Sequence, residues 1–323
     1  MQMLARYPRS VGDGDRVGPR AQGAAGRAAS RSPAAMARGT HLSGPTAAAL
    51  LLVVAILGAA APGMTDAAKI LAVLPHSGHT HFKVFEPLLK GLAAKGHNVL
   101  VLSHYPQAKP PPRYEDISLV GAMPSLEATL ELSHLERLTP FGDFAEITRI
   151  GQASCEPTFT LPEVAALLES NRTFDIVLTE VFNTDCFLGF AYRYRPAPFV
   201  ALSSSMLMPW GYGRIGAPLS SSYSPNLFLG LAPPLSLPQR VVNAAFTLAV
   251  NAYWKVFRLT SAYTVVNRYF GPRVPPLEAI AANTSLVLLN THHSVHGPQP
   301  WPPGVVEIGG VHIDDPKPLS KVR

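Results

Sequence analysis

The stretch KILAVLPHSGHTHFKVFEPLLKGLAAKGHNVLVLSH, residues 69–104, decides the fold of this chain. KILAVLP (69–75) is an apolar run that ends at a proline, as expected for a buried strand. FKVFEPLLKGLAAKGH (82–97) places apolar side chains at helical spacing, and Gly96 is the expected stop signal. NVLVLSH (98–104) has the pattern of a second buried strand. Strand, helix and strand in this order form a βαβ unit, so we predict a parallel sheet.

A second unit of the same kind follows in the middle of the chain. FDIVLTE (174–180) and PFVALSS (198–204) have the length and composition of buried strands, and CFLGFAYRY (186–194) between them has a helical pattern. SLVLLN (285–290) and GVVEIGG (304–310) are the last strand candidates. The sequence therefore predicts an α/β fold in which a mostly parallel sheet carries helices on both faces.

The segments between these units are less regular. We expect a short strand near 117–120, broken helical segments within 124–170, a long functional or disordered loop at 205–238 and a helical run at 239–270. The residues expected to break the helical segments are Pro140, Gly142 and Pro157. Polar residues interrupt the run at 239–270, so we expect an amphipathic helix that packs on the domain or touches a membrane surface.

Charge is concentrated at one end of the chain. The 323 residues are 47% hydrophobic and 15% charged, which is enough apolar material for a sizeable core. Five of the six net positive charges lie in residues 1–44, where seven arginines face two aspartates. The rest of the chain is nearly neutral, so we expect no nucleic-acid partner. We interpret residues 1–44 as a disordered basic leader.

Residues 45–67 have the pattern of a signal peptide. The uncharged apolar run at 46–62 follows Arg38 and is succeeded by small residues. The run is short for a membrane span of about 20 residues, although a signal anchor is an alternative interpretation. We therefore place the protein in the secretory pathway, in the lumen of the endoplasmic reticulum.

Two further features bear on that compartment. The sequons that begin at Asn171 and Asn283 predict N-glycosylation in the lumen. Cys155 and Cys186 could pair there, but two thiols do not make a disulfide framework, so we do not expect a bridge.

Three histidines, His76, His79 and His81, follow the first predicted strand within six residues. In a parallel α/β sheet the ligand site lies at the carboxyl ends of the strands. Glu180 ends another predicted strand, and Asp185 lies in the loop behind it. A histidine and a carboxylate in these places make a plausible general base and the group that orients it.

Other interpretations of the histidines exist. His79-x-His81 after a strand is similar to the first ligand pair of metal-dependent amidohydrolases, so a metal-dependent hydrolase is one alternative. The later predicted strands end in Glu180, Ser203 and Asn290, which do not complete such a site, and we therefore expect no metal. PHSGHTHF lacks the G-x-G-x-x-G fingerprint of nicotinamide cofactors. Solvated loop histidines without a function are a further alternative.

Several segments together resemble the amino-terminal half of insect-type UDP-glycosyltransferases. They occur in the family's order and span about residues 68–320: LPHSGHTHFKVFEPLLKGLAAKGHNVLVLSHYPQ, FDIVLTEVFNTDCFLGFAYRYRPAPFVALSSS, LLNTH and PGVVEIGGVHIDDPKPL. The resemblance implies a GT-B fold, in which two Rossmann-like domains face a cleft. It implies that the amino-terminal domain binds the acceptor, that the carboxy-terminal domain binds a UDP-sugar, and that no cofactor is needed.

The resemblance also assigns a catalytic histidine. In the family, the histidine that deprotonates the acceptor hydroxyl directly precedes an aromatic residue and lies 16 residues before the histidine of the KGH motif. In this chain that histidine is His81, which precedes Phe82 and lies 16 residues before His97. Its partner is usually an aspartate at the end of the FDIVLTE-like strand. This chain has Glu180 there, and Asp185 is the alternative partner.

The remaining expectations concern the acceptor and the donor. We expect a small lipophilic acceptor with a hydroxyl group, bound by Phe82, Ser203, Met206, Trp210 and Tyr212, although ordinary packing also accounts for apolar residues.

No nucleotide-sugar signature follows DDPKPLSKVR. We therefore interpret residues 68–316 as the acceptor-binding domain and residues 317–323 as a truncated linker, with the donor domain missing and the chain inactive alone. A non-catalytic acceptor-binding or partner protein is the alternative. Membrane association of the full-length protein and oligomerisation are expected only by analogy with the family.

Overall fold

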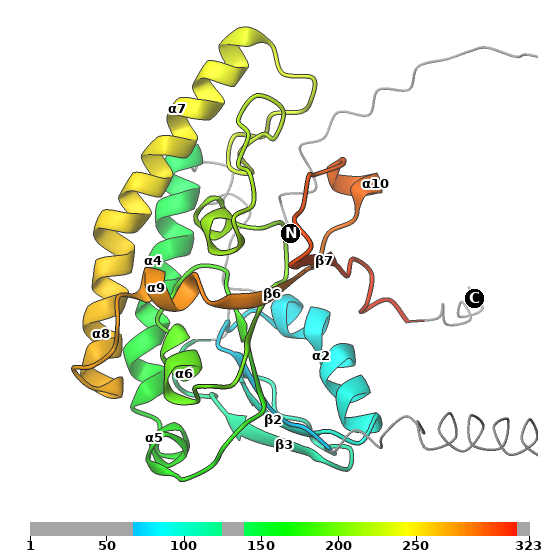
Figure 1. Cartoon of the computed structure of the whole chain (residues 1–323), viewed down its shortest axis with the longest axis vertical. Helices are drawn as coiled ribbons and strands as arrows, with labels where there is room; N and C mark the ends of the chain where they lie inside the picture. Colours follow the sequence, from blue (N-terminus) through cyan, green and yellow to red (C-terminus); the bar gives the residue numbers. More distant parts are fainter. Residues whose placement is uncertain (1–66, 125–138, 315–323) are drawn as a thin grey trace, which may run out of the picture. The chain divides into compact units, whose positions relative to one another are not determined.

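The computed structural model describes residues 67–124 and 139–314, which form a parallel α/β domain (Figure 1). The strands are β1 (Lys69–Leu74), β2 (Asn98–Ser103), β3 (Tyr114–Ser118), β4 (Ile176–Glu180), β5 (Phe199–Ser203), β6 (Thr284–Leu289) and β7 (Val305–Glu307). The α-helices are α2 (His79–Ala94), α4 (Pro140–Phe159), α5 (Pro162–Glu169), α6 (Leu188–Arg193), α7 (Leu237–Tyr253), α8 (Thr260–Phe270), α9 (Leu277–Ala281) and α10 (His293–His296). The expected leader, most of the expected signal peptide and the expected linker lie outside the described residues.

The strand order places the carboxyl ends of particular strands side by side. The order is β3-β2-β1-β4-β5-β6-β7, and every pairing is parallel. The chain moves outward from β1 to β3 and then returns to pair β4 with the other side of β1, for example Ile70 with Ile176. Such a reversal leaves a crevice at the carboxyl ends of the two central strands. The loops after β1, β4 and β5 therefore meet at one edge of the sheet.

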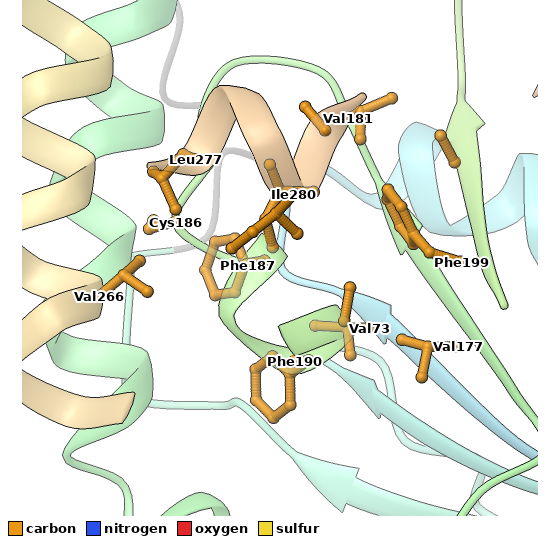
Figure 2. Packing of buried hydrophobic residues seen from close by; sticks show 14 of the residues in the cluster. Val73, Val177, Val181, Cys186, Phe187, Phe190, Phe199, Val266, Leu277 and Ile280 are labelled. Atoms are coloured by element: carbon orange, nitrogen blue, oxygen red, sulfur yellow. The ribbon is translucent and has the colours of Figure 1, made fainter. Parts of the chain in front are cut away.

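Alternating residues of each central strand feed two separate cores. Ile70, Ala72 and Leu74 of β1 pack with α2, while Leu71 and Val73 pack with the opposite layer of helices. Figure 1 shows α2 on one side of the sheet and α4, α6 and α8 on the other. In the second core, Phe190 of α6 and Phe187 just before it lie between the sheet, α8 and α9 (Figure 2). The predicted parallel sheet with helices on both faces is confirmed.

Two helix boundaries differ from the sequence-based expectation. The helix α2 begins at His79, so His79 and His81 lie in its first turn and the interpretation of this turn as loop was wrong. Gly78 precedes it in an extended conformation. The helix α4 begins at Pro140, one of the predicted breaks, but it continues through the other two, Gly142 and Pro157. The backbone N–H of Gly142 donates to the Thr139 side chain at 3.1 Å, so this glycine belongs to the helix start.

The long helical run of the sequence is one continuous segment. Ser236 and Gln239 form a capping box at the start of α7, a π-helical turn (Trp254–Leu259) follows, and α8 completes the run. One side of α7 packs on the domain through its buried residues, whereas Val241 and Leu248 are 62% and 72% exposed. Within the ranges that the structure describes, no helix is both long and apolar enough to span a membrane.

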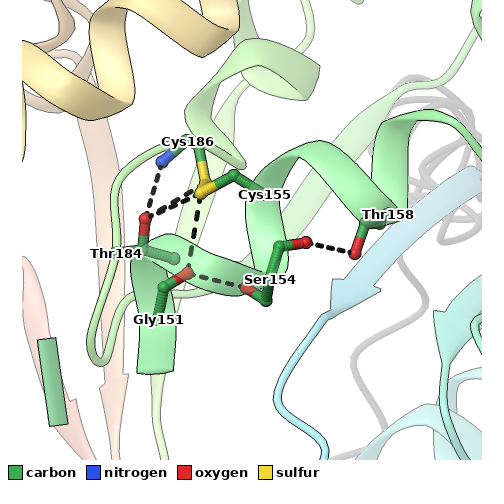
Figure 3. Close-up of a disulfide and its surroundings, with 6 residues drawn as sticks. All are labelled: Gly151, Ser154, Cys155, Thr158, Thr184 and Cys186. Carbon is green, nitrogen blue, oxygen red and sulfur yellow. Dashed lines mark hydrogen bonds between the residues drawn. A yellow bond between two sulfur atoms is a disulfide. The ribbon is translucent and has the colours of Figure 1, made fainter. Parts of the chain in front are cut away.

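A disulfide joins Cys155 of α4 to Cys186, in the loop between β4 and α6 (Figure 3). The expectation of unpaired cysteines was therefore wrong. The two residues are 31 positions apart, but the fold brings their Cα atoms within 6.0 Å. Gly151, one turn earlier on α4, makes the same contact possible, since a Cβ there would lie 2.3 Å from the backbone oxygen of Asn183. This pair of contacts holds the loop after β4 against α4.

Candidate functional site

His81 and Glu180 meet at the carboxyl edge of the sheet. His81 lies in the first turn of α2, Glu180 is the last residue of β4, and the distance from Nδ1 to Oε1 is 2.6 Å. An ionised carboxylate can only accept a hydrogen bond, so the proton of this contact is on Nδ1. The other ring nitrogen of His81, Nε2, is then free to accept a proton. The Glu180 side chain is 2% exposed and that of His81 is 17% exposed.

Ser204 completes this contact from the end of β5. Its hydroxyl donates to Glu180 Oε1 at 2.8 Å and lies 2.7 Å from His81 Nδ1. Asn290, just after β6, donates to the backbone oxygen of Ser204 at 2.9 Å. Residues at or just beyond the carboxyl ends of four neighbouring strands therefore hold the imidazole and its carboxylate in place.

The sequence analysis named Ser203 as an acceptor-binding candidate, whereas the serine that contacts the histidine and its carboxylate is Ser204. Ser203 is fully buried, and its hydroxyl donates to the backbone oxygen of Ser205 at 3.1 Å. Successive residues of a strand point to opposite sides, so Ser203 and Ser204 cannot both reach the histidine. The three serines at 203–205 are evident in the sequence, but the sequence does not show which of them points toward the histidine.

Glu180 is ionised despite its burial. Burial by itself raises the pKa of this carboxyl group, but the proximity of His81, the hydrogen bond from His81, the His76 ring and the Ser204 hydroxyl together outweigh it. The pKa of Glu180 therefore lies below its usual value. A buried charge of this kind persists only when it is paired and hydrogen-bonded.

Two rings enclose the imidazole of His81. The His76 ring is stacked on it, with centroids 3.6 Å apart and planes inclined by 11°. Phe182, in the loop after β4, presents its ring at a steep angle to both histidines, at 4.6 Å from His81 and 5.4 Å from His76. Burial, followed by the proximity of His81, lowers the pKa of His76 to about 3, so His76 is neutral at physiological pH.

The second candidate carboxylate has a different partner. Asp185 forms a buried ion pair with Arg214, which lies in the 3-10 helix η2 (Pro209–Ile215). This pair ties the loop after β4 to the segment after β5. Of the two carboxylates left open by the sequence, Glu180 is the one that contacts His81.

The residues expected to bind the acceptor are mostly packed against other side chains. Phe82 and Tyr212 are 3% and 6% exposed, and each lies in a core cluster. Trp210 is stacked on Trp254, with centroids 4.2 Å apart and planes inclined by 9°. Met206 is half-buried. An acceptor-binding role for these residues and for Ser203 stays a prediction.

The histidines of the opening motif have separate surroundings. His79 lies against Tyr105, with ring centroids 4.8 Å apart, whereas Nδ1 of His81 is engaged by Glu180. Across residues 67–124 and 139–314, no three His, Cys, Asp or Glu side chains are grouped so that they could hold a metal ion. Of the sequon residues, Asn171 and Asn283 are both exposed, and their glycosylation stays a prediction.

Comparison with known proteins relates this chain to enzymes that use UDP-sugars. Residues 50–322 match the model of the family described as "UDP-glucoronosyl and UDP-glucosyl transferase". The chain belongs to this family. The resemblance found in the sequence is therefore confirmed.

The relatives of this UDP-glycosyltransferase family member include insect and viral proteins. UDP-glucosyltransferase 2 of Dactylopius coccus is 33% identical over 79% of this chain and 50% of its own length. An ecdysteroid UDP-glucosyltransferase of Autographa californica nuclear polyhedrosis virus is 25% identical over 80% of this chain and 52% of its own length. The chain thus spans about half the length of the curated relatives it matches.

Among solved structures, "LpCGTa in complex with UDP" matches with 14% identity and a TM-score of 0.31, over 75% of this chain and 53% of that chain. "Phytolacca americana UGT2 complexed with UDP-2fluoro-glucose and pterostilbene" matches with 13% identity and a TM-score of 0.32, over 76% of this chain and 55% of that chain.

Proposed function

We propose that this chain is the acceptor-binding half of a UDP-glycosyltransferase, with His81 as the general base. The observation that carries the proposal is the 2.6 Å contact between His81 Nδ1 and the ionised Glu180. This contact puts the imidazole proton on Nδ1 and leaves Nε2 as the acceptor of a proton. Family membership supports a UDP-sugar as the donor. The proposed reaction uses no cofactor.

The reaction moves one proton and one sugar. Nε2 of His81 takes the proton of an acceptor hydroxyl while the acceptor oxygen attacks the anomeric carbon of the UDP-sugar. The bond from that carbon to the UDP oxygen breaks on the opposite face, so the configuration inverts and UDP leaves. The Glu180 carboxylate stabilises the imidazolium that forms. Acid–base help of this type is worth about 10²–10⁴ in rate.

The acceptor class follows from two kinds of support. Apolar and aromatic residues, among them Met206 and Trp210, lie in the segment that follows β5. Several relatives are named ecdysteroid UDP-glucosyltransferases, and an ecdysteroid is a lipophilic molecule with hydroxyl groups. Both support a small lipophilic acceptor with a hydroxyl group.

The proposed setting is the lumen of the endoplasmic reticulum, beside the membrane. The exposed apolar residues Val241 and Leu248 of α7 support contact with a lipid surface. The disulfide between Cys155 and Cys186 supports an oxidising compartment.

The test is a fusion of residues 1–323 to the carboxy-terminal half of UDP-glucosyltransferase 2 of Dactylopius coccus. Release of UDP from UDP-glucose is measured with a panel of phenols and an ecdysteroid as acceptors. We expect turnover, and we expect His81→Ala to lower it by about 10²-fold or more. The matched control is His79→Ala, in the same helical turn, which should cost much less because His79 lies against Tyr105.

Three results would contradict the proposal. Equal losses for His76, His79 and His81 variants would favour a shared metal site. Hydrolysis of UDP-glucose without transfer of its sugar to any of the acceptors would favour the hydrolase alternative. Acceptor binding by the chain in calorimetry, with no turnover by the folded fusion, would favour a non-catalytic binding protein.

A further inference from the structure

The turn between β1 and α2 contains His76, which has no role in the proposed reaction. His76 follows Pro75 directly after β1, and its Nδ1 accepts a hydrogen bond from the Gly78 backbone N–H at 2.9 Å. Gly78 has no side chain, and a Cβ there would lie 2.9 Å from both Nδ1 and Cε1 of the His76 ring. The turn therefore leaves room for this ring in one place, flat against His81.

The stack restrains a motion that the other contacts leave free. The hydrogen bond to Glu180 fixes Nδ1 of the His81 ring, but coupled rotations about the Cα–Cβ and Cβ–Cγ bonds can still tilt the ring plane at that contact. The parallel His76 ring at 3.6 Å and the Phe182 ring at 4.6 Å block this tilt from two directions. Since a displacement of about 1 Å can cost 10²-fold in rate, the orientation of Nε2 matters to a base.

We propose that His76 is a positioning residue, a neutral ring that fixes the plane of the His81 imidazole and faces the positive charge formed there. Its catalytic consequence rests on the proposed function. Because its Nδ1 lone pair is occupied by the Gly78 N–H, neutral His76 carries its proton on Nε2. The low pKa of His76, caused first by burial, supports the neutral form.

The neighbouring charges agree with this role. Glu180 is the ionised group that contacts His81, and His104, whose own pKa is lowered by burial, contributes to lowering the pKa of His76. A neutral aromatic face next to a forming cation is favourable, and more so where water is excluded. A charged His76 would instead repel the imidazolium of His81.

The first test needs no enzymatic activity. The 323-residue chain is labelled with ¹⁵N-histidine, and the Nδ1–H of His81 is followed by NMR, with His81→Asn as the assignment control. A ring proton held by a carboxylate appears far downfield and exchanges slowly with water. We expect His76→Ala to remove this slow exchange and His76→Phe, which keeps a flat ring, to retain it.

Gly78→Ala provides a second variant in case His76→Ala does not fold. The Gly78 backbone, at φ −86° and ψ 122°, suits alanine, so the added methyl group acts mainly by displacing the His76 ring. We expect faster exchange of the His81 proton in this variant. A folded His76→Ala or Gly78→Ala variant with an unchanged His81 signal would overturn the proposal.

The second test uses the fusion enzyme. We expect His76→Ala to lower kcat by about ten-fold or more with KM changed by about two-fold or less, and His76→Phe to restore most of kcat. Equal losses in both variants would mean that the stack is not the cause. If the wild-type fusion transfers no sugar, the proposed function fails, and the NMR experiment decides the positioning role separately.

Discussion

Reduction of the Cys155–Cys186 disulfide is the most direct test of the described fold. The bridge closes a loop of 31 residues. In the chain-entropy treatment, a closed loop of that size destabilises the unfolded state by about 3.7 kcal/mol at about 25 °C. For a domain of about 250 residues, each 1 kcal/mol shifts Tm by about 2–4 °C. We therefore expect reductant to lower Tm by roughly 7–15 °C.

The assay is thermal unfolding followed by circular dichroism, with and without reductant. A Cys155→Ala/Cys186→Ala double variant is the control, because reductant should leave its Tm unchanged. Thiol titration of the denatured, unreduced protein should find no free thiol, since both cysteines of the chain are in the bridge. Two titratable thiols per chain, or a Tm that does not respond to reductant, would refute the reasoning.

Three further predictions concern the site, the packing of α4 and the surface. Glu180→Gln should lower transfer by the fusion about ten-fold or more, because the imidazolium loses its counter-charge. The pKa of Glu180 is lowered on folding, so its stabilising contribution is present above pH 4.5 and is lost as the pH falls below that value. In urea unfolding, the Glu180→Gln variant should therefore lose less stability than the wild type in this acid range. Equal pH profiles for the two proteins would contradict the assignment. Gly151→Ala should destabilise the domain by about 1–3 kcal/mol, because the new Cβ would clash with the backbone of Asn183. Gly91→Ala in α2 has open space around it and should stabilise the domain by about 0.5–1 kcal/mol. Unfolding midpoints measure both effects, and equal shifts would contradict the close approach of Gly151 to Asn183. The chain should sediment with anionic liposomes, and Val241→Glu/Leu248→Glu should reduce this without changing the circular dichroism spectrum; binding that the double variant leaves intact would place the lipid contact elsewhere.

Much of the fold was determined by the sequence alone, because periodicity is a local property. The run at 69–104 predicts strand, helix and strand from apolar spacing, and the structure has all three with shifted ends. Parallel pairing follows, because a helix packed on the sheet returns the chain to the end from which the first strand started, and the next strand then runs in the same direction. The location of the candidate site could also be predicted from the sequence, since the polar residues that follow the strands of a parallel sheet lie at the same edge of that sheet.

The exact partners within that edge were decided only by tertiary structure. Glu180 and Asp185 were equivalent candidates in the sequence, and the packing of β4 against β1 is what places Glu180 against His81 while Asp185 pairs with Arg214. Ser204 could not be chosen over Ser203, because a shift of one residue in a strand reverses the direction of the side chain.

The disulfide and the His76–His81 stack depend in the same way on distances in space. Cys155 and Cys186 are brought together by the approach of α4 to the loop after β4, which Gly151 permits. His76 reaches His81 because α2 begins three residues earlier than its apolar pattern indicates, so that the turn at Gly78 folds one ring onto the other. The spacing of apolar residues shows which residues lie on the same face of a helix or strand. Contacts between elements depend instead on strand register, on where helices end and on the close approach of backbones.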